Sequence, residues 1–421
     1  MAVLATPASA LESISTEWRE GLRYVARQPI LDLHGRVHGY ELLFRAGPEL
    51  AFRGDGDKAT MTILDNTVMF GLEKLTGGLP AFVNCTLDAL TEELVGILPK
   101  DMTVLEILET VEPTPDLIAA CRRLKASGYR LALDDFVWER KFDPLVELAD
   151  YIKVDFGLTG PKERLRLFQR LRGRPIAMLA EKVDTQEEYQ QARTEGFTLF
   201  QGYYFCRPVL MNNRKIPSNR MGHFELLKLL QSDDIDVHEA SRMMKRDASM
   251  TYRLLRLANS PMYALHMEIR SIQTALLVLG EKTFRRIVTL AIASDLNGEQ
   301  PLEILRMAFL RGRFCELASE RCGLDPGEQY LLGMLSMLPA MMLMPMENLA
   351  PTLPLRDEIK SALKGAANRE RVLLGWLESH ERGDWATCDT VVEANGLCEL
   401  EMVACYRSAL EWAGAALKLT A

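Results

Sequence analysis

The six residues Leu131-Ala132-Leu133-Asp134-Asp135-Phe136 combine a short apolar run with two adjacent carboxylates. An apolar run of this length predicts a buried strand, so the two aspartates stand at its carboxyl end. Carboxylates in that position are typical ligands of a divalent metal ion. The same pair would also suit an Asx turn or a helix N-cap, because aspartate favours both.

Similar apolar runs that carry a polar residue recur along the first half of the chain. These polar residues are Asn84, Glu106, Lys153, Glu181 and Gln201. With Asp134 included, they follow one another at intervals of 22, 28, 19, 28 and 20 residues, and amphipathic segments fill the intervals. Each interval fits one strand, one helix and two turns. The series predicts βα units with a parallel sheet, closed into a TIM-like (β/α)8 barrel.

Two extended segments, 24–29 and 37–44, precede this series around a turn at 32–35. The second contributes Glu41 to the face where the strands end. The side chains expected to meet there form an all-oxygen cluster of Glu41, Asn84, Glu106, Asp134, Asp135 and Glu181. Such a cluster suits Mg²⁺ or Mn²⁺. Two such ions, about 3.5–4 Å apart, are the arrangement that hydrolyses phosphodiesters.

Three further residues would assist this chemistry. Lys153 would orient the attacking water or neutralise developing charge, and Gln201 would position water or substrate. Arg45 would meet a phosphate or a guanine edge. Each also has a simpler interpretation: Glu41 and Arg45 as a solvated ion pair, Lys153 as an exposed strand-end lysine, and Gln201 as a cap.

Length and composition limit the number of domains and the class of protein. A chain of 421 residues favours two domains, and 48% hydrophobic with 26% charged residues fits sizeable cores. The net charge of −8 disfavours a nucleic-acid-binding surface. No signal peptide or membrane span is expected, because the start lacks a basic n-region and the apolar stretch 333–346 is short and interrupted by proline. The eight cysteines include no CxxC pair and are expected to be reduced thiols of a cytoplasmic protein.

The βα rhythm stops after residue 212, and the remainder reads as helices with one apolar face, for example at Met250, Leu254 and Leu257. We therefore expect a flexible N-terminus over 1–20, a barrel domain over 21–212 and an all-helical bundle over 213–421.

Residues from about 24 to 210 resemble the EAL domain, the barrel phosphodiesterase that linearises cyclic di-GMP with two Mg²⁺ or Mn²⁺ ions. The matching pieces are Gln28-Pro29, Glu41-Leu42-Leu43-Phe44-Arg45, Asn84, Glu106 with Glu109, Asp134-Asp135-Phe136, Lys153-Val154-Asp155, Ala180 to Thr185, and Gln201-Gly202-Tyr203. The resemblance implies that the six oxygen-bearing residues are the metal site. It implies catalytic positions at Glu41, Lys153 and Gln201, and contacts to the dinucleotide from Gln28, Arg45 and Asp155.

The sequence departs from the EAL pattern at two places. Active members follow the two aspartates with a Phe-Gly-Thr-Gly-type loop, which clamps the metals and the dimer contact and is anchored by the glutamate matching Glu109. Here 136–140 reads Phe-Val-Trp-Glu-Arg, and bulky residues cannot supply glycine's backbone conformations. The Glu-Gly-Val-Glu segment has become Glu181-Lys182-Val183-Asp184. These departures predict weak or absent turnover with binding retained, and put a homodimer in doubt.

The second half resembles the HDOD domain over roughly 215–400, through Leu254 to Pro261 and 269–275. That family is related to the HD metal-dependent hydrolases, but 333–339 reads Gly-Met-Leu-Ser-Met-Leu-Pro and has no His-Asp pair. We expect a non-catalytic domain for protein interaction or allostery, with His223, His238, His266 and His380 at the surface or at helix ends. The methionines of 334–346 are expected in the core, with an adaptable partner-binding groove as the alternative.

Three functions stay open from the sequence. The first is a regulator that binds cyclic di-GMP with little or no hydrolysis and acts through the helical domain. The second is an active Mg²⁺- or Mn²⁺-dependent phosphodiesterase, for which the retained ligand set argues. The third is a scaffold that binds neither nucleotide nor metal, in which the Lys182 ammonium partly replaces a cation's charge.

Overall fold

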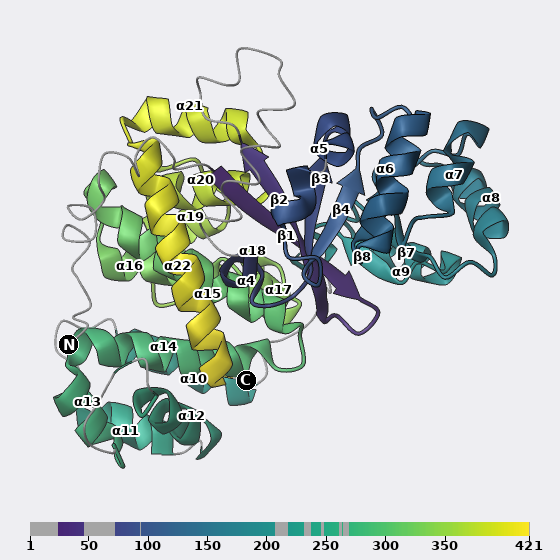
Figure 1. Ribbon diagram of the computed structural model, residues 1–421. Coiled ribbons are helices and arrows are strands. Elements are labelled where there is room, and N and C mark those ends of the chain that lie inside the picture. Colours follow the sequence, from purple (N-terminus) through teal and green to yellow (C-terminus); the bar gives the residue numbers. More distant parts are fainter. Residues whose placement is uncertain are drawn as a thin grey trace. The chain divides into compact units, whose positions relative to one another are not determined.

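The structure, a computed structural model, describes residues 24–45, 72–92, 94–206, 218–230, 237–245, 248–260, 263 and 269–420. It divides into two compact units (Figure 1): Met1–Arg207 with Glu378–Thr390, and Pro208–Leu377 with Val391–Ala421. The predicted flexible start over 1–20 and the predicted boundary at 212/213 lie outside the described residues. Grouping Glu378–Thr390 with the first unit differs from the single cut that the sequence suggested.

The first unit contains the predicted barrel of eight strands, closed in the order β1 to β8. The strands are β1 (Tyr24–Asp32), β2 (Val37–Arg45), β3 (Ala81–Cys85), β4 (Thr103–Ile107), β5 (Arg130–Leu133), β6 (Tyr151–Asp155), β7 (Ala177–Glu181) and β8 (Leu199–Gln201). Neighbours from β2 to β8 are parallel, whereas β1 is antiparallel to both β2 and β8. The antiparallel pair of β1 and β2 matches the two extended segments predicted around the turn at 32–35, because so short a turn can only join antiparallel strands.

Short helices cover and connect these strands. They are α4 (Leu72–Thr76), α5 (Leu87–Thr91), η1 (Leu94–Ile97), α6 (Pro115–Ala126), η2 (Arg140–Phe142), α7 (Asp143–Val146), α8 (Pro161–Leu171), α9 (Gln186–Glu195) and η3 (Tyr204–Cys206). Local signals fix their ends. In α9, Thr185 and Glu188 form a capping box, and Gly196 ends the helix with φ 110°.

A hydrophobic layer fills the barrel and positions the residues above it. This layer is formed by Ile30, Phe82, Val104, Ala132, Tyr151, Leu179 and Leu199. Side chains on a strand alternate, so the residue two positions further along points to the same side. Two positions beyond the layer, in β3 to β8 or directly after β5, stand Asn84, Glu106, Asp134, Lys153, Glu181 and Gln201. In the antiparallel β1 the equivalent residue precedes Ile30 and is Gln28. The predicted site is therefore the next inward-facing layer of the same barrel.

The second unit is helical, as predicted. Its elements are α10 (Ser218–Leu229), α11 (Val237–Lys245), α12 (Ala248–Ala258), α13 (Ile272–Leu279), α14 (Glu281–Asn297), α15 (Leu302–Ala318), η5 (Ser319–Cys322), α16 (Pro326–Leu335), α17 (Leu338–Met342), α18 (Met346–Leu349), η6 (Ala350–Thr352), α19 (Asp357–Leu363), η7 (Arg369–Arg371) and α22 (Glu399–Thr420). Two more helices, α20 (Val372–Glu381) and α21 (Trp385–Asn395), are divided between the two units. Gly280, with φ 74°, ends α13 and separates it from α14.

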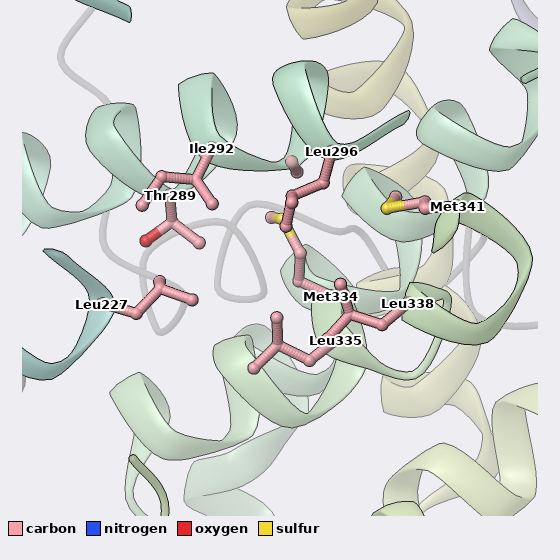
Figure 2. Close-up of a pocket in the computed structure, with 9 residues that line it drawn as sticks. Leu227, Thr289, Ile292, Leu296, Met334, Leu335, Leu338 and Met341 are labelled. Carbon is pink, nitrogen blue, oxygen red and sulfur yellow. The ribbon is translucent and has the colours of Figure 1, made fainter. Parts of the chain in front are cut away.

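The methionines of 334–346 lie in the core of this unit, which confirms their predicted place. All six are buried: Met334, Met337, Met341, Met342, Met344 and Met346. Two of them, Met334 and Met341, line a small apolar pocket (Figure 2). Its other walls are Leu227, Thr289, Ile292, Ala293, Leu296, Leu335 and Leu338.

Candidate active site

A single buried ammonium group organises the carboxyl end of the barrel. The Nζ atom of Lys153 lies 2.7 Å from Glu106 Oε1, 2.8 Å from Asp134 Oδ1, 2.9 Å from Glu181 Oε1 and 3.3 Å from Glu41 Oε2. The Lys153 side chain is 0% exposed, so its interpretation as an exposed strand-end lysine is wrong. The two aspartates likewise follow a strand and do not cap a helix.

The cluster retains oxygen atoms that no group of the described residues satisfies. Buried and without a hydrogen-bond partner are Glu106 Oε2, Glu181 Oε2 and Asn84 Oδ1. Buried acceptors without a partner are costly, and a hard cation is the natural partner for carboxylate and amide oxygens. The donor set therefore fits Mg²⁺ or Mn²⁺. In the present arrangement the carboxylates converge on the Lys153 ammonium. Within the described ranges, no group of three or more His, Cys, Asp or Glu side chains has the geometry to hold a metal ion.

Burial and charge set the protonation of this cluster. Burial raises the pKa of Glu106 well above its ordinary value, against the attraction of Lys153. Burial likewise raises the pKa of Glu181, to about 8. Burial works in the same direction on Glu41, but the Lys153 ammonium and hydrogen bonds from neighbouring side chains outweigh it and lower the pKa of Glu41. A divalent ion entering the site would therefore displace protons from Glu106 and Glu181.

Amide side chains hold Glu41 in place. Gln201 Nε2 donates to Glu41 Oε2 at 2.6 Å and to Gln28 Oε1 at 2.8 Å, and Asn84 Nδ2 donates to Glu41 Oε1 at 3.2 Å. Gln201 thus lies within the cluster and does not cap a helix. The side chain of Arg45, at the end of β2, lies outside the described part of the chain, so its predicted contacts stay predictions.

The second aspartate turns away from Lys153 and faces another lysine. Lys182 Nζ lies 2.6 Å from Asp155 Oδ2 and 3.4 Å from Asp135 Oδ2. The other oxygen of Asp155 accepts hydrogen bonds from the backbone N–H groups of Gly157 and Leu158. Burial opposes ionisation of Asp155, but the hydrogen bonds from Lys182 and these N–H groups lower its pKa. Asp155, expected to contact a dinucleotide, is thus engaged by this chain's own groups.

Two relatives align along most of the chain. The uncharacterized protein YuxH of Bacillus subtilis is 34% identical over 400 residues, which are 92% of this chain and 97% of YuxH. CdgJ of Vibrio cholerae, named a cyclic di-GMP phosphodiesterase, is 34% identical over 372 residues, which are 86% of this chain and 85% of CdgJ. The EAL domain model matches residues 84–208, and the HDOD domain model matches residues 216–375. The chain belongs to the EAL–HDOD family.

Solved structures give a more distant likeness. The complex of Klebsiella pneumoniae BlrP1 with manganese and cy-diGMP at pH 6 is 22% identical, with a TM-score of 0.35, over 43% of this chain and 54% of that one. The EAL domain of Mycobacterium smegmatis DcpA is 20% identical, with a TM-score of 0.36, over 43% of this chain and 91% of that one. The match to the EAL domain model begins at Asn84 and therefore does not include β1 and β2. These two strands, which carry Gln28 and Glu41, belong to the same closed barrel as β3 to β8.

The loop after the two aspartates of the EAL domain is held by aromatic contacts. Phe136 is buried and meets Trp138 and Phe142 edge to face, with ring centroids 6.0 and 5.9 Å apart. The guanidinium of Arg170 lies 5.0 Å from the Trp138 ring. Glu109, predicted to anchor this loop, is exposed, and its carboxylate has no hydrogen bond or ion pair among the described residues. Sequence reasoning missed this aromatic packing, although the bulky residues that replace the glycines were its signal.

In the HDOD domain, the position at which a His-Asp pair would be expected contains Ser336, at the C-terminal end of α16. The Ser336 hydroxyl donates to Gly333 O at 2.7 Å and accepts from Arg311 Nη1 at 3.2 Å. Asn259 lies in the segment that carries the HDOD resemblance. It donates to the backbone carbonyl of Ile269 and accepts from its N–H, both at 2.7 Å, so it connects the end of α12 to the segment before α13.

No helix within the described ranges has the length and apolar character needed to cross a bilayer.

The histidines of the second half differ from expectation. His223 is buried in the middle of α10, with Nε2 3.0 Å from Asp295 Oδ2, so the prediction of a surface or helix-end position is wrong for it. His380 lies in the last turn of α20, as predicted, but it is also buried, and burial lowers its pKa to about 3. The His238 side chain and His266 lie outside the described part of the chain.

Proposed function

We propose that this EAL–HDOD protein binds cyclic di-GMP with Mg²⁺ or Mn²⁺ at the barrel mouth and hydrolyses it slowly, as a regulator in cyclic di-GMP signalling. The observation that carries the proposal is the convergence of four carboxylates on the buried Lys153, with unpartnered oxygen atoms left for a cation. The alignment with CdgJ along 86% of the chain supports the choice of ligand.

The residues that would hold the cation are those whose oxygens lack partners. Glu106, Glu181 and Asn84 would contribute these oxygens, with Glu41 and Asp134 beside them. When bound, Mg²⁺ or Mn²⁺ supplies Lewis-acid polarisation of the phosphodiester. Release of the protons of Glu106 and Glu181 accompanies loading, so binding is favoured as the pH rises.

The remaining polar groups would act on the dinucleotide. The Lys153 ammonium lies within 3.3 Å of four carboxylates and would stabilise negative charge that develops on the phosphate. Gln201 and Gln28 would orient the ligand through their amide groups, which already form one hydrogen-bonded row with Glu41.

The expected turnover is low because the groups beside this cluster depart from the family pattern. The loop after Asp135 is packed by Phe136, Trp138 and Phe142 and has no glycine over 136–140. Lys182 further engages Asp135.

For the HDOD domain we propose binding of a protein partner, and for the whole protein a cytoplasmic location.

The test is incubation of the full chain with cyclic di-GMP and Mn²⁺ or Mg²⁺, with chromatography for the linear product and calorimetry for binding. We expect binding with slow product formation, and loss of product in Glu41→Ala. The control is Glu112→Gln, which removes an exposed carboxylate of the same unit and should change neither readout. Product that persists in Glu41→Ala would contradict the site, and neither binding nor product would favour the scaffold.

A second candidate is an efficient phosphodiesterase, favoured by the name of CdgJ and by the retained carboxylates. The same assay separates the two. Turnover of about 1 s⁻¹ or more, in the range typical of enzymes, would favour this candidate over the slow regulator.

A further inference from the structure

The two adjacent aspartates of the EAL domain face two different ammonium groups. Asp134 lies 2.8 Å from Lys153 Nζ, whereas Asp135 lies 3.4 Å from Lys182 Nζ. Lys182 also pairs with Asp155 at 2.6 Å. The Lys153 side chain is fully buried, whereas the Lys182 side chain is 61% exposed. The ammonium group beside Asp134 is therefore shielded from solvent, and the one beside Asp135 is not.

The barrel imposes the direction in which Lys182 leaves the chain. Its φ of 54° lies in the left-handed region, which glycine adopts freely and lysine rarely does. The turn is fixed because Val183 N donates to Gln201 O at 3.0 Å and Tyr204 N donates to Val183 O at 3.1 Å. The lysine is therefore held where its ammonium reaches both carboxylates.

The two carboxylates that Lys182 joins are also held in place. Asp155 is oriented by the backbone N–H groups of Gly157 and Leu158 at 3.0 and 2.9 Å. Asp135 has φ 38° and lies between two fixed residues, since Asp134 N donates to Ile107 O and Phe136 N donates to Lys153 O. Its Oδ1 is buried and has no hydrogen-bond partner among the described residues. The surroundings of Asp135 thus contain the positive charge of Lys182 and one buried oxygen, Asp135 Oδ1, that lacks a hydrogen-bond donor.

We propose that the Lys182 ammonium takes the place of one of two divalent ions, so that one ion binds at the Lys153 cluster and a second binds far more weakly. This inference rests on the proposed metal site. A unit charge about 4–5 Å from a divalent ion, in a water-like dielectric, lowers the ion's affinity roughly twentyfold. Two ions together stabilise the attacking and leaving oxygens of a phosphodiester, so a site loaded with one ion retains binding while hydrolysis is slow.

The experiment counts bound Mn²⁺ without relying on activity. The full chain is titrated with Mn²⁺, and the free ion is followed by electron paramagnetic resonance. The variants are Lys182→Gln, which removes the charge, and Lys182→Gly, which also takes φ 54° without strain and guards against misfolding. Lys182→Arg keeps the charge. Lys141→Gln is the matched control, because Lys141 pairs with Glu112 and Glu139 in the same unit.

We expect the second dissociation constant to fall about twentyfold in Lys182→Gln and Lys182→Gly, with the first unchanged. Lys182→Arg and Lys141→Gln should match the original chain. Two ions of equal affinity in the original chain, or an unchanged second constant in both uncharged variants, would overturn the role of Lys182 alone. Absence of Mn²⁺ binding in every protein would instead overturn the proposed function, and the inference with it.

Discussion

Replacing Lys153 with methionine removes the one ammonium around which the barrel site is built. The side chain is 0% exposed and faces four carboxylates at 2.7 to 3.3 Å, and methionine keeps most of its volume. Removing one partner of a buried ionic cluster leaves uncompensated charge and costs about 3–5 kcal/mol. We expect a loss of this size in the free energy of unfolding of the barrel at pH 7.5 without divalent ions.

The loss should depend on pH in a defined direction. Lys153 lowers the pKa of Glu41 against the opposing effect of burial. A lowered acid pKa contributes stability above the unfolded value, here 4.5, and loses it as the pH falls through the folded value. Lys153→Met should therefore be most damaging at neutral and alkaline pH, and the difference should shrink as the pH falls below 4.5. Added Mn²⁺ should restore part of the lost stability, because it supplies the missing positive charge.

The assay is urea unfolding followed by hydrogen exchange in the peptide that carries β4, which reports on the barrel and not on the helical unit. Lys125→Met is the matched control, because the Lys125–Asp150 ion pair is partly exposed. The control should cost less than about 1 kcal/mol. A Lys153→Met chain within about 1 kcal/mol of the original at pH 7.5, or a loss that grows as the pH falls below 4.5, would refute the reasoning.

Two further outcomes follow from the same site. Because burial above all raises the pKa of Glu181 to about 8, Mn²⁺ must displace its proton below that pH. Release of this proton should raise the apparent affinity by up to about tenfold per pH unit between pH 6 and 8, and release of the Glu106 proton steepens the rise. Calorimetry that finds a flat profile would contradict this. Gly202→Ala should prevent stable folding of the barrel, since its φ is 142° and a Cβ there would overlap the backbone of Val183. Thermal unfolding should show no such effect for Gly96→Ala, where a Cβ meets nothing within 4 Å.

Much of the barrel site was predictable because strand residues have a fixed period. The apolar runs placed Phe82, Val104 and Tyr151 in the strands, and the residue two positions later in each is a site residue. Parallel strands of a closed barrel end on one face, so the order of such runs was enough to gather Glu106 and Lys153 without knowledge of the helices between them.

The sequence by itself thus determined which residues line the barrel and which share its mouth, because alternation and strand order are local properties of the chain. Only the tertiary structure decided how those side chains pair. It placed Lys153 at the centre of the carboxylates, turned Asp135 toward Lys182, and left Glu109 on the surface. It also buried His223 against Asp295. These outcomes depend on backbone angles such as the φ of 54° at Lys182 and on contacts between residues distant in the chain, which no short stretch of sequence encodes.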